Sequence, residues 1–182
     1  MMELLNVLNE MTLSEFASYF DYMLMTVSIT CLTIAWCNVN TRWLLINILA
    51  IELLNVAFSD YFRTGESFFI WAVGVDMLFI FLLAFRKYTA YIMALHKRNA
   101  FSSLFRKAYF RHMFNNNEAA IIGVYCFAAV LSTITGLEGQ LYIYDVISSR
   151  PVRADLYQPI MLMFQFMLTI NVIRVTKTAL RS

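Results

Sequence analysis

Residues 68–87, FFIWAVGVDMLFIFLLAFRK, join a long apolar run to two cations. The run, 68–85, contains one charged residue, Asp76, near its middle, and Arg86 and Lys87 follow it directly. A helix needs about 20 mostly apolar residues to cross the hydrocarbon core of a bilayer, within a range of about 17–25. This stretch therefore predicts a transmembrane helix that leaves the membrane at Arg86.

The composition of the whole chain points the same way. Of its 182 residues, 60% are hydrophobic and 14% are charged, and the mean hydropathy is +0.64. Soluble domains are usually about 45–50% apolar and about 25% charged. With only 5 Gly and 2 Pro the chain has no flexible linker, so we expect one integral membrane domain over residues 1–182.

Several further stretches have the length and the hydropathy of a membrane span. We therefore predict an all-α, polytopic transmembrane helical bundle of about five spans. Residues 1–19, which contain four leucines and three glutamates, are expected to form an amphipathic helix on the outer side, either on the leaflet or packed on the bundle. The predicted spans are 20–37, 43–58, 68–85, 119–137 and 157–175.

The orientation follows from the positive charges, which accumulate on the cytoplasmic side of membrane proteins. We therefore place the basic segment 86–114 inside, and alternation then puts the N-terminus outside and the C-terminus in the cytoplasm. All but three of the 14 Lys and Arg residues, Arg63, Arg150 and Arg153, fall on the inner side. The expected location is a plasma membrane of the bacterial inner-membrane type. The basic residues of the segment are Arg86, Lys87, Lys97, Arg98, Arg106, Lys107 and Arg111.

Part of this segment has the pattern of an amphipathic helix. Apolar residues recur at i, i+3, i+4, i+7 and i+8, and the nearby cations fall off that stripe. We expect a helix in the membrane interface, with its rings among the acyl chains and its cations near anionic lipid phosphates. Docking of a cytoplasmic partner is an alternative, whereas a lipid-facing stripe offers no stacking platform for nucleic acid. The stripe consists of Phe101, Leu104, Phe105, Ala108 and Tyr109.

Two carboxyl groups are predicted at the bilayer midplane. Glu52 lies about halfway along 43–58 and Asp76 about halfway along 68–85, and the short connection makes these spans antiparallel neighbours. An ionisable residue at a helix centre costs about 2.5–3.5 kcal/mol on insertion scales. No Lys or Arg lies at that depth, so we expect at least one carboxyl group to be protonated at pH 7. Asn47, Asn55, Ser59 and Gln165 extend this predicted polar layer.

Three further patterns concern helix packing. Thr26, Thr30 and Thr33 form a polar stripe that predicts a face directed toward the interior of the bundle. Small residues spaced by four, as at 128, 132 and 136 and at 119 and 123, allow helices to approach closely. The sequence Asn115-Asn-Asn-Glu118 matches a capping box at the start of the fourth span.

We consider three functions. The first is a cation or proton pathway, in a homo-oligomer whose copies bring Glu52 and Asp76 around a pore. The alternative is a non-catalytic scaffold or accessory subunit of a larger membrane complex. An intramembrane aspartyl protease is the third, because Gly74-Val75-Asp76 is a fragment of the Gly-x-Gly-Asp pattern; Asp21 and Asp145 are poor second aspartates, so we expect no enzyme. We expect neither a cofactor nor a metal site, since Cys31, Cys37 and Cys126 lack ligand spacing.

Overall fold

The computed structural model describes residues 13–62, 67–95, 100–110 and 114–181. Within these ranges all regular structure is helical, as predicted. Two short helices, α5 and α6, lie between the long ones, and a single π-helical turn, η1, precedes the last. The elements are α2 (Leu13–Ile34), α3 (Val39–Phe62), α4 (Ser67–Ala84), α5 (Arg86–Leu95), α6 (Ala100–Phe110), α7 (Asn116–Ile143), η1 (Val152–Leu156) and α8 (Tyr157–Arg181).

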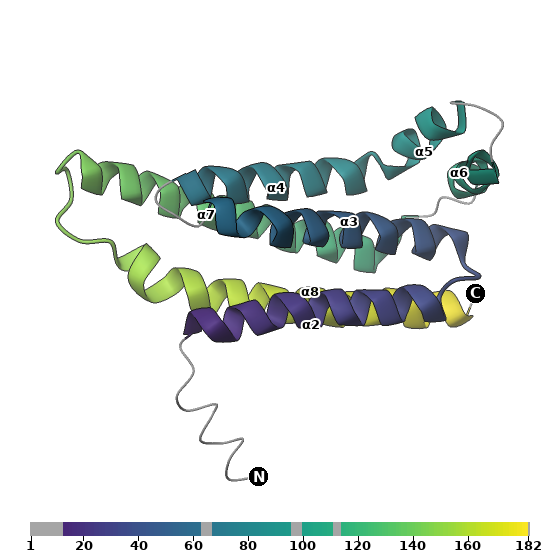
Figure 1. Cartoon of the computed structure of the whole chain (residues 1–182), viewed down its shortest axis with the longest axis horizontal. Coiled ribbons are helices and arrows are strands. Elements are labelled where there is room, and N and C mark those ends of the chain that lie inside the picture. The colour runs from purple at the N-terminus through teal and green to yellow at the C-terminus, as the bar shows by residue number, and fades with distance from the viewer. Residues whose placement is uncertain (1–12, 63–66, 96–99, 111–113, 182) are drawn as a thin grey trace, which may run out of the picture.

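The long helices of the described part form a closed ring in the order α2, α3, α4, α7 and α8, with α8 returning to α2. The most extensive packing joins α4 to α7 and α2 to α8. Figure 1 shows these helices running along one common axis, with α5, α6 and the C-terminus at one end. We call this the basic end. The connection from α7 to η1 lies at the opposite end (Figure 1).

Three described helices are long and apolar enough to cross a membrane: Val39–Phe58, Asn116–Ile143 and Val152–Arg181. A fourth is present if Phe68–Ala84 and Arg86–Leu95, which are bent by 72° relative to each other, count as one broken span. In α2 the apolar part, Tyr22–Ile34, is shorter. These helices are compatible with an integral membrane protein, whereas a fifth span over 20–37 stays a prediction.

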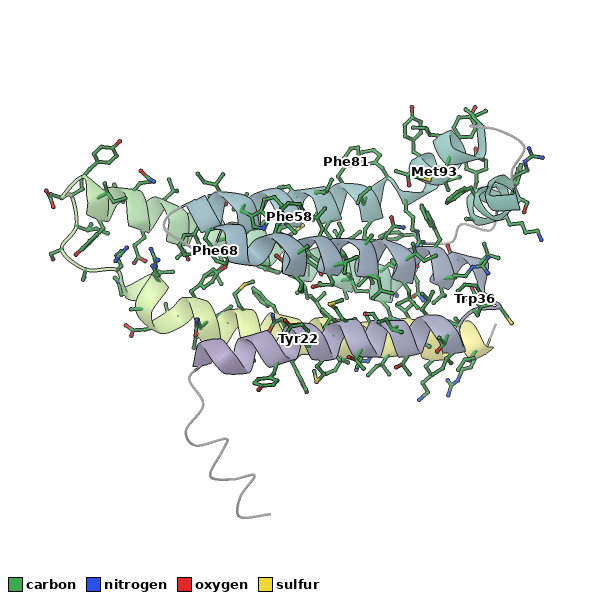
Figure 2. The ribbon with its side chains drawn as sticks, in the orientation of Figure 1. Tyr22, Trp36, Phe58, Phe68, Phe81 and Met93 are labelled. Carbon is green, nitrogen blue, oxygen red and sulfur yellow. The ribbon has the colours of Figure 1, made fainter. Side chains whose placement is uncertain are left out.

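Many large apolar side chains lie exposed on the outside of the bundle, as is expected of a surface that meets lipid. Tyr22 of α2, Phe58 of α3, Phe81 of α4 and Met93 of α5 are each about half exposed, as is Trp36 in the connection between α2 and α3 (Figure 2). The interior is mostly apolar, with a smaller set of buried polar residues. Its fully buried side chains include Leu24, Leu45, Phe79, Ile121 and Val172.

The capping box at the start of α7 is confirmed. Asn115 is the N-cap residue, and its side-chain oxygen accepts a hydrogen bond from the Asn117 backbone N–H at 3.4 Å. The Glu118 carboxylate in turn accepts from the Asn115 backbone N–H. Each partner thus satisfies a backbone donor that the first helical turn leaves without an intrahelical acceptor.

The threonine stripe on α2 was predicted to face the interior of the bundle, but it faces outward. Thr26, Thr30 and Thr33 are exposed, and their hydroxyl groups donate to backbone oxygens of their own helix at 2.7–2.8 Å. A threonine that bonds to the preceding turn has no unsatisfied donor. The stripe can therefore face lipid and does not line the interior.

The apolar stripe of α6 also differs from the prediction, because its described members pack on protein. Ala108 is 3% exposed, and the Phe105 ring meets Trp43 of α3 edge to face, with 5.0 Å between centroids. Tyr109 packs in the same small cluster, which also includes Ala90 of α5. Phe101 and Leu104 have side chains outside the described set. The stripe thus holds α6 against α3 and α5.

One of the small-residue patterns lies where α7 packs closely on α4. Ala128 and Ser132 are buried, and a Cβ atom added at Gly136 would lie 3.2 Å from the Phe69 Cβ atom of α4. The second pattern has no such neighbour, since a Cβ atom at Gly123 would meet nothing within 4 Å. Glycine at 136 is therefore what lets α7 approach α4 there.

This contrast gives a first prediction. Gly136→Leu should destabilise the protein by about 1–3 kcal/mol, because overpacking forces α4 and α7 apart. Gly123→Leu is the matched control on the same helix and should leave stability unchanged or slightly raised, since leucine is the better helix former. Thermal melting of both variants in one detergent checks the difference. Equal melting temperatures would show that the α4–α7 contact at Gly136 is not tight.

Candidate functional site

The interior of the ring contains a hydrogen-bonded carboxyl group. Glu52, from α3, is 6% exposed, and its Oε1 atom accepts a hydrogen bond from the Tyr125 hydroxyl of α7 at 2.8 Å. The Tyr125 ring stacks on Phe79 of α4, with 3.6 Å between centroids and 27° between the planes. Helices α3, α4 and α7 therefore position this carboxyl group together. Its hydrogen bond joins α3 to α7 in the interior of the bundle.

The second carboxyl group lies in the same interior. Asp76 of α4 is 8% exposed and precedes Phe79 by one helical turn, on the same face. It lies within electrostatic range of Glu52. Its Oδ2 atom is buried and has no hydrogen-bond partner among the described residues. The structure thus brings together the two carboxyl groups that the sequence placed at one depth.

On the other side of Asp76, two hydroxyl groups lead toward the end opposite the basic one. Tyr157, the first residue of α8, lies within electrostatic range of Asp76. Its hydroxyl oxygen is 3.4 Å from Ser132 Oγ of α7, which is fully buried. Beyond them, the Glu138 carboxylate accepts the backbone N–H groups of Val152 and Arg153 at 2.9 and 2.8 Å and so caps η1.

Three further residues of the predicted polar layer have described side chains, and these are bonded within their own helix or only half-buried. Asn47 is 7% exposed, but its Nδ2 atom donates to the Trp43 carbonyl oxygen of its own helix at 2.7 Å. Asn55 and Gln165 are half-buried. The side chain of Ser59 lies outside the described set. The described carboxyl pair is thus the part of the predicted layer that the fold gathers.

A second charged cluster lies at the basic end. Arg86 at the start of α5 is 1% exposed, and its Nη2 atom pairs with Glu118 Oε2 of α7 at 2.9 Å. The same nitrogen donates to Asn40 Oδ1 of α3 at 3.1 Å. The Trp43 indole N–H donates to the Arg86 carbonyl oxygen at 3.4 Å. Arg86 therefore ties α3, α5 and α7 together and does not face headgroups as expected.

Three of the other cations in the basic segment lie on the surface of the protein. Lys87, Arg106 and Lys107 are exposed, and the Lys87 Nζ atom lies 5.3 Å from the centre of the Tyr109 ring. Lys97, Arg98 and Arg111 lie outside the described residues. Within the described ranges, no group of three or more His, Cys, Asp or Glu side chains comes together.

Sequence reasoning missed the hydroxyl groups of the site. Tyr125 shares a helical face with Ala128 and Ser132, at i, i+3 and i+7, and that small-residue face was the available signal. Tyr157, the first residue of α8, is half-buried beside Ser132, and the sequence gives no signal for this contact. No protein-family model matches the chain, and no curated protein or solved structure matches it either.

Proposed function

We propose that this chain is an integral membrane protein that carries protons through the interior of its own helix bundle. Glu52 and Asp76 are the groups that bind and release them. The observation that carries the proposal is the burial of both carboxyl groups, at 6% and 8% exposure, within electrostatic range of each other inside one copy. Intramembrane ionisable residues of this kind mark proton relays in pumps and transporters.

The positions of the described Lys and Arg residues favour proton binding by Glu52 and Asp76 over ion pairing with a basic side chain. The described Lys and Arg residues lie within about two turns of a helix end, so none reaches the middle of the bundle. A purely structural role would be served at lower cost by an amide or a hydroxyl group. A carboxyl group that can be protonated avoids the cost of a buried charge in one of its two states.

The groups around the carboxyl pair favour a proton over a larger cation. A hydroxyl group both donates and accepts a hydrogen bond, so Tyr125, Tyr157 and Ser132 can pass a proton without a wide pore. Hard metal cations take six or more oxygen ligands. The hydroxyl groups of Tyr157 and Ser132 continue the proposed path from Asp76 toward the end of the bundle where η1 begins.

The half of the bundle next to the basic end is apolar, which supports a barrier to free proton leakage. Between Tyr125 and Glu118 α7 runs for about 10 Å, and the buried residues it contributes there include Ile121 and Val124. The stacked rings of Tyr125 and Phe79 lie at the end of this apolar stretch that is next to Glu52. Burial inside one copy also means that a ring of carboxylates between copies is not needed, and a homo-oligomer stays a prediction.

Proton flux into liposomes tests the function. Purified protein is reconstituted, a potassium diffusion potential drives protons inward, and a dye inside reports pH. We expect Glu52→Gln and Asp76→Asn each to lower the flux about tenfold or more, because an amide does not take up a proton under these conditions. Asp155→Asn, an exposed carboxylate on η1, is the matched control and should keep wild-type flux.

Two results would overturn the proposal. One is flux that persists in a Glu52→Gln/Asp76→Asn double variant of unchanged size on gel filtration. The other is a wild-type protein that passes no protons in either direction. In that case the accessory-subunit function gains support, and a second membrane protein should copurify with the chain in mild detergent.

A further inference from the structure

The bend between α4 and α5 creates a groove at the basic end. It has a volume of about 400 Å³ and is lined by Ala84, Phe85, Lys87, Tyr88, Tyr91 and Tyr109. The α5 residues come from the first two turns after the bend, and Tyr109 comes from α6. The rings of Tyr91 and Tyr109 lie 5.4 Å apart, and those of Tyr88 and Tyr91 lie 6.5 Å apart. One cation and three phenol groups therefore share one open concavity.

The groove carries positive charge without a nearby acidic residue in the sequence. No Asp or Glu occurs between Asp76 and Glu118, and Glu118 is already paired with Arg86. Lys87, in contrast, is exposed. Arg106 is also exposed and precedes Tyr109 by three residues, on the same side of α6. The site is thus suited to an anion with oxygen acceptors.

On the α4 side of the bend the exposed surface is apolar. Phe81 of α4 and Phe85 at the bend itself are 52% and 50% exposed, with their rings 4.7 Å apart (Figure 2 labels Phe81). They belong to the helix pair that counts as one broken membrane span, so acyl chains can reach them. A charged, phenol-lined groove above an exposed aromatic pair matches the two chemical parts of a phospholipid.

We propose that this groove binds one anionic phospholipid. Its phosphate lies beside Lys87 and the tyrosine hydroxyl groups, and an acyl chain lies along Phe81 and Phe85. A soluble acidic peptide or a nucleic acid would leave those two rings uncovered. This proposal is independent of proton transfer, because the groove lies at the basic end and shares no residue with the carboxyl pair.

Lipid retention tests the proposal. The full chain is reconstituted in nanodiscs with equal amounts of phosphatidylglycerol and phosphatidylcholine, and native mass spectrometry counts the lipids that each released protein keeps. We expect wild type to keep one phosphatidylglycerol preferentially. Lys87→Gln should lower that preference about tenfold, and Lys87→Arg should restore it. Lys107→Gln removes an exposed cation from the same segment but outside the groove, and should keep it.

Two outcomes would overturn the proposal. Equal losses in Lys87→Gln and Lys107→Gln would mean that the whole basic segment attracts anionic lipid without a site. No preference for phosphatidylglycerol in wild type would mean that the groove does not recognise a charged headgroup. All three variants change exposed side chains, and gel filtration in detergent shows whether each is folded.

Discussion

Glu118→Gln is expected to lower the free energy of unfolding by about 3–5 kcal/mol. The substitution leaves the Arg86 guanidinium, which is 1% exposed, without its negative partner, and an uncompensated buried charge is strongly destabilising. Glutamine retains an oxygen that can accept the Asn115 backbone N–H, so the N-terminal cap of α7 is preserved. The variant therefore isolates the charge. Equilibrium unfolding in a titration with denaturing detergent measures the loss.

A double variant separates the ion pair from simple damage to the fold. Arg86→Met/Glu118→Gln removes both charges and should recover most of the stability that Glu118→Gln loses, because replacing a whole buried pair is often neutral. The difference between the double variant and the sum of the single ones gives the coupling of the two residues. A double variant as unstable as Glu118→Gln would contradict the pairing of these side chains.

Asp76→Leu is expected to have the opposite effect on stability and to abolish proton flux. The buried Oδ2 atom has no hydrogen-bond partner in the described part of the chain, and a polar atom buried in this way costs about 1–3 kcal/mol. Leucine removes that cost and suits the apolar interior. A variant that is more stable yet inactive is the expected mark of a residue retained for function.

The matched control for this prediction is Asn171→Leu on α8. Asn171 is 7% exposed, like Asp76, but its Nδ2 atom donates to the Met167 carbonyl oxygen at 2.8 Å. Its substitution should therefore change stability less than Asp76→Leu does. Thermal melting in one detergent compares the two. If Asp76→Leu melted below wild type, Asp76 would be holding the helices together, and its role would be structural.

The positions of the two carboxyl groups along their helices could be predicted, because the apolar runs that predict the spans also show where each helix has its middle; their depth in a membrane stays a prediction. Glu52 and Asp76 fall near the middle of α3 and α4, and the fold brings them close together. The hydrogen-bond partner of Glu52, Tyr125, could not be predicted in the same way. Span 119–137 is almost wholly apolar, and although its small-residue face of Ala128 and Ser132 indicates an inward side, that pattern does not show which side chain of another helix Tyr125 meets. Only the packing of α7 on α4 places Tyr125 over Phe79.

The basic segment shows a second limit of sequence patterns. Neighbouring residues on a helix point about 100° apart, so Arg86 turns into the bundle while Lys87 stays exposed. The positive-charge pattern places both at one side of the membrane and does not distinguish them. The apolar stripe of α6 was found correctly, but lipid and protein satisfy such a stripe equally. Trp43, on which Phe105 packs, lies far away in the sequence.

Infrared difference spectroscopy can show whether Glu52 and Asp76 take up and release a proton. Spectra of the protein in lipid are compared between mildly acidic and mildly alkaline buffer, where a protonated carboxyl group absorbs apart from a carboxylate. We expect a carboxyl band that titrates in wild type, changes in Glu52→Gln and disappears in the Glu52→Gln/Asp76→Asn double variant. A band that is absent in wild type, or identical in the double variant, would contradict proton binding at this pair.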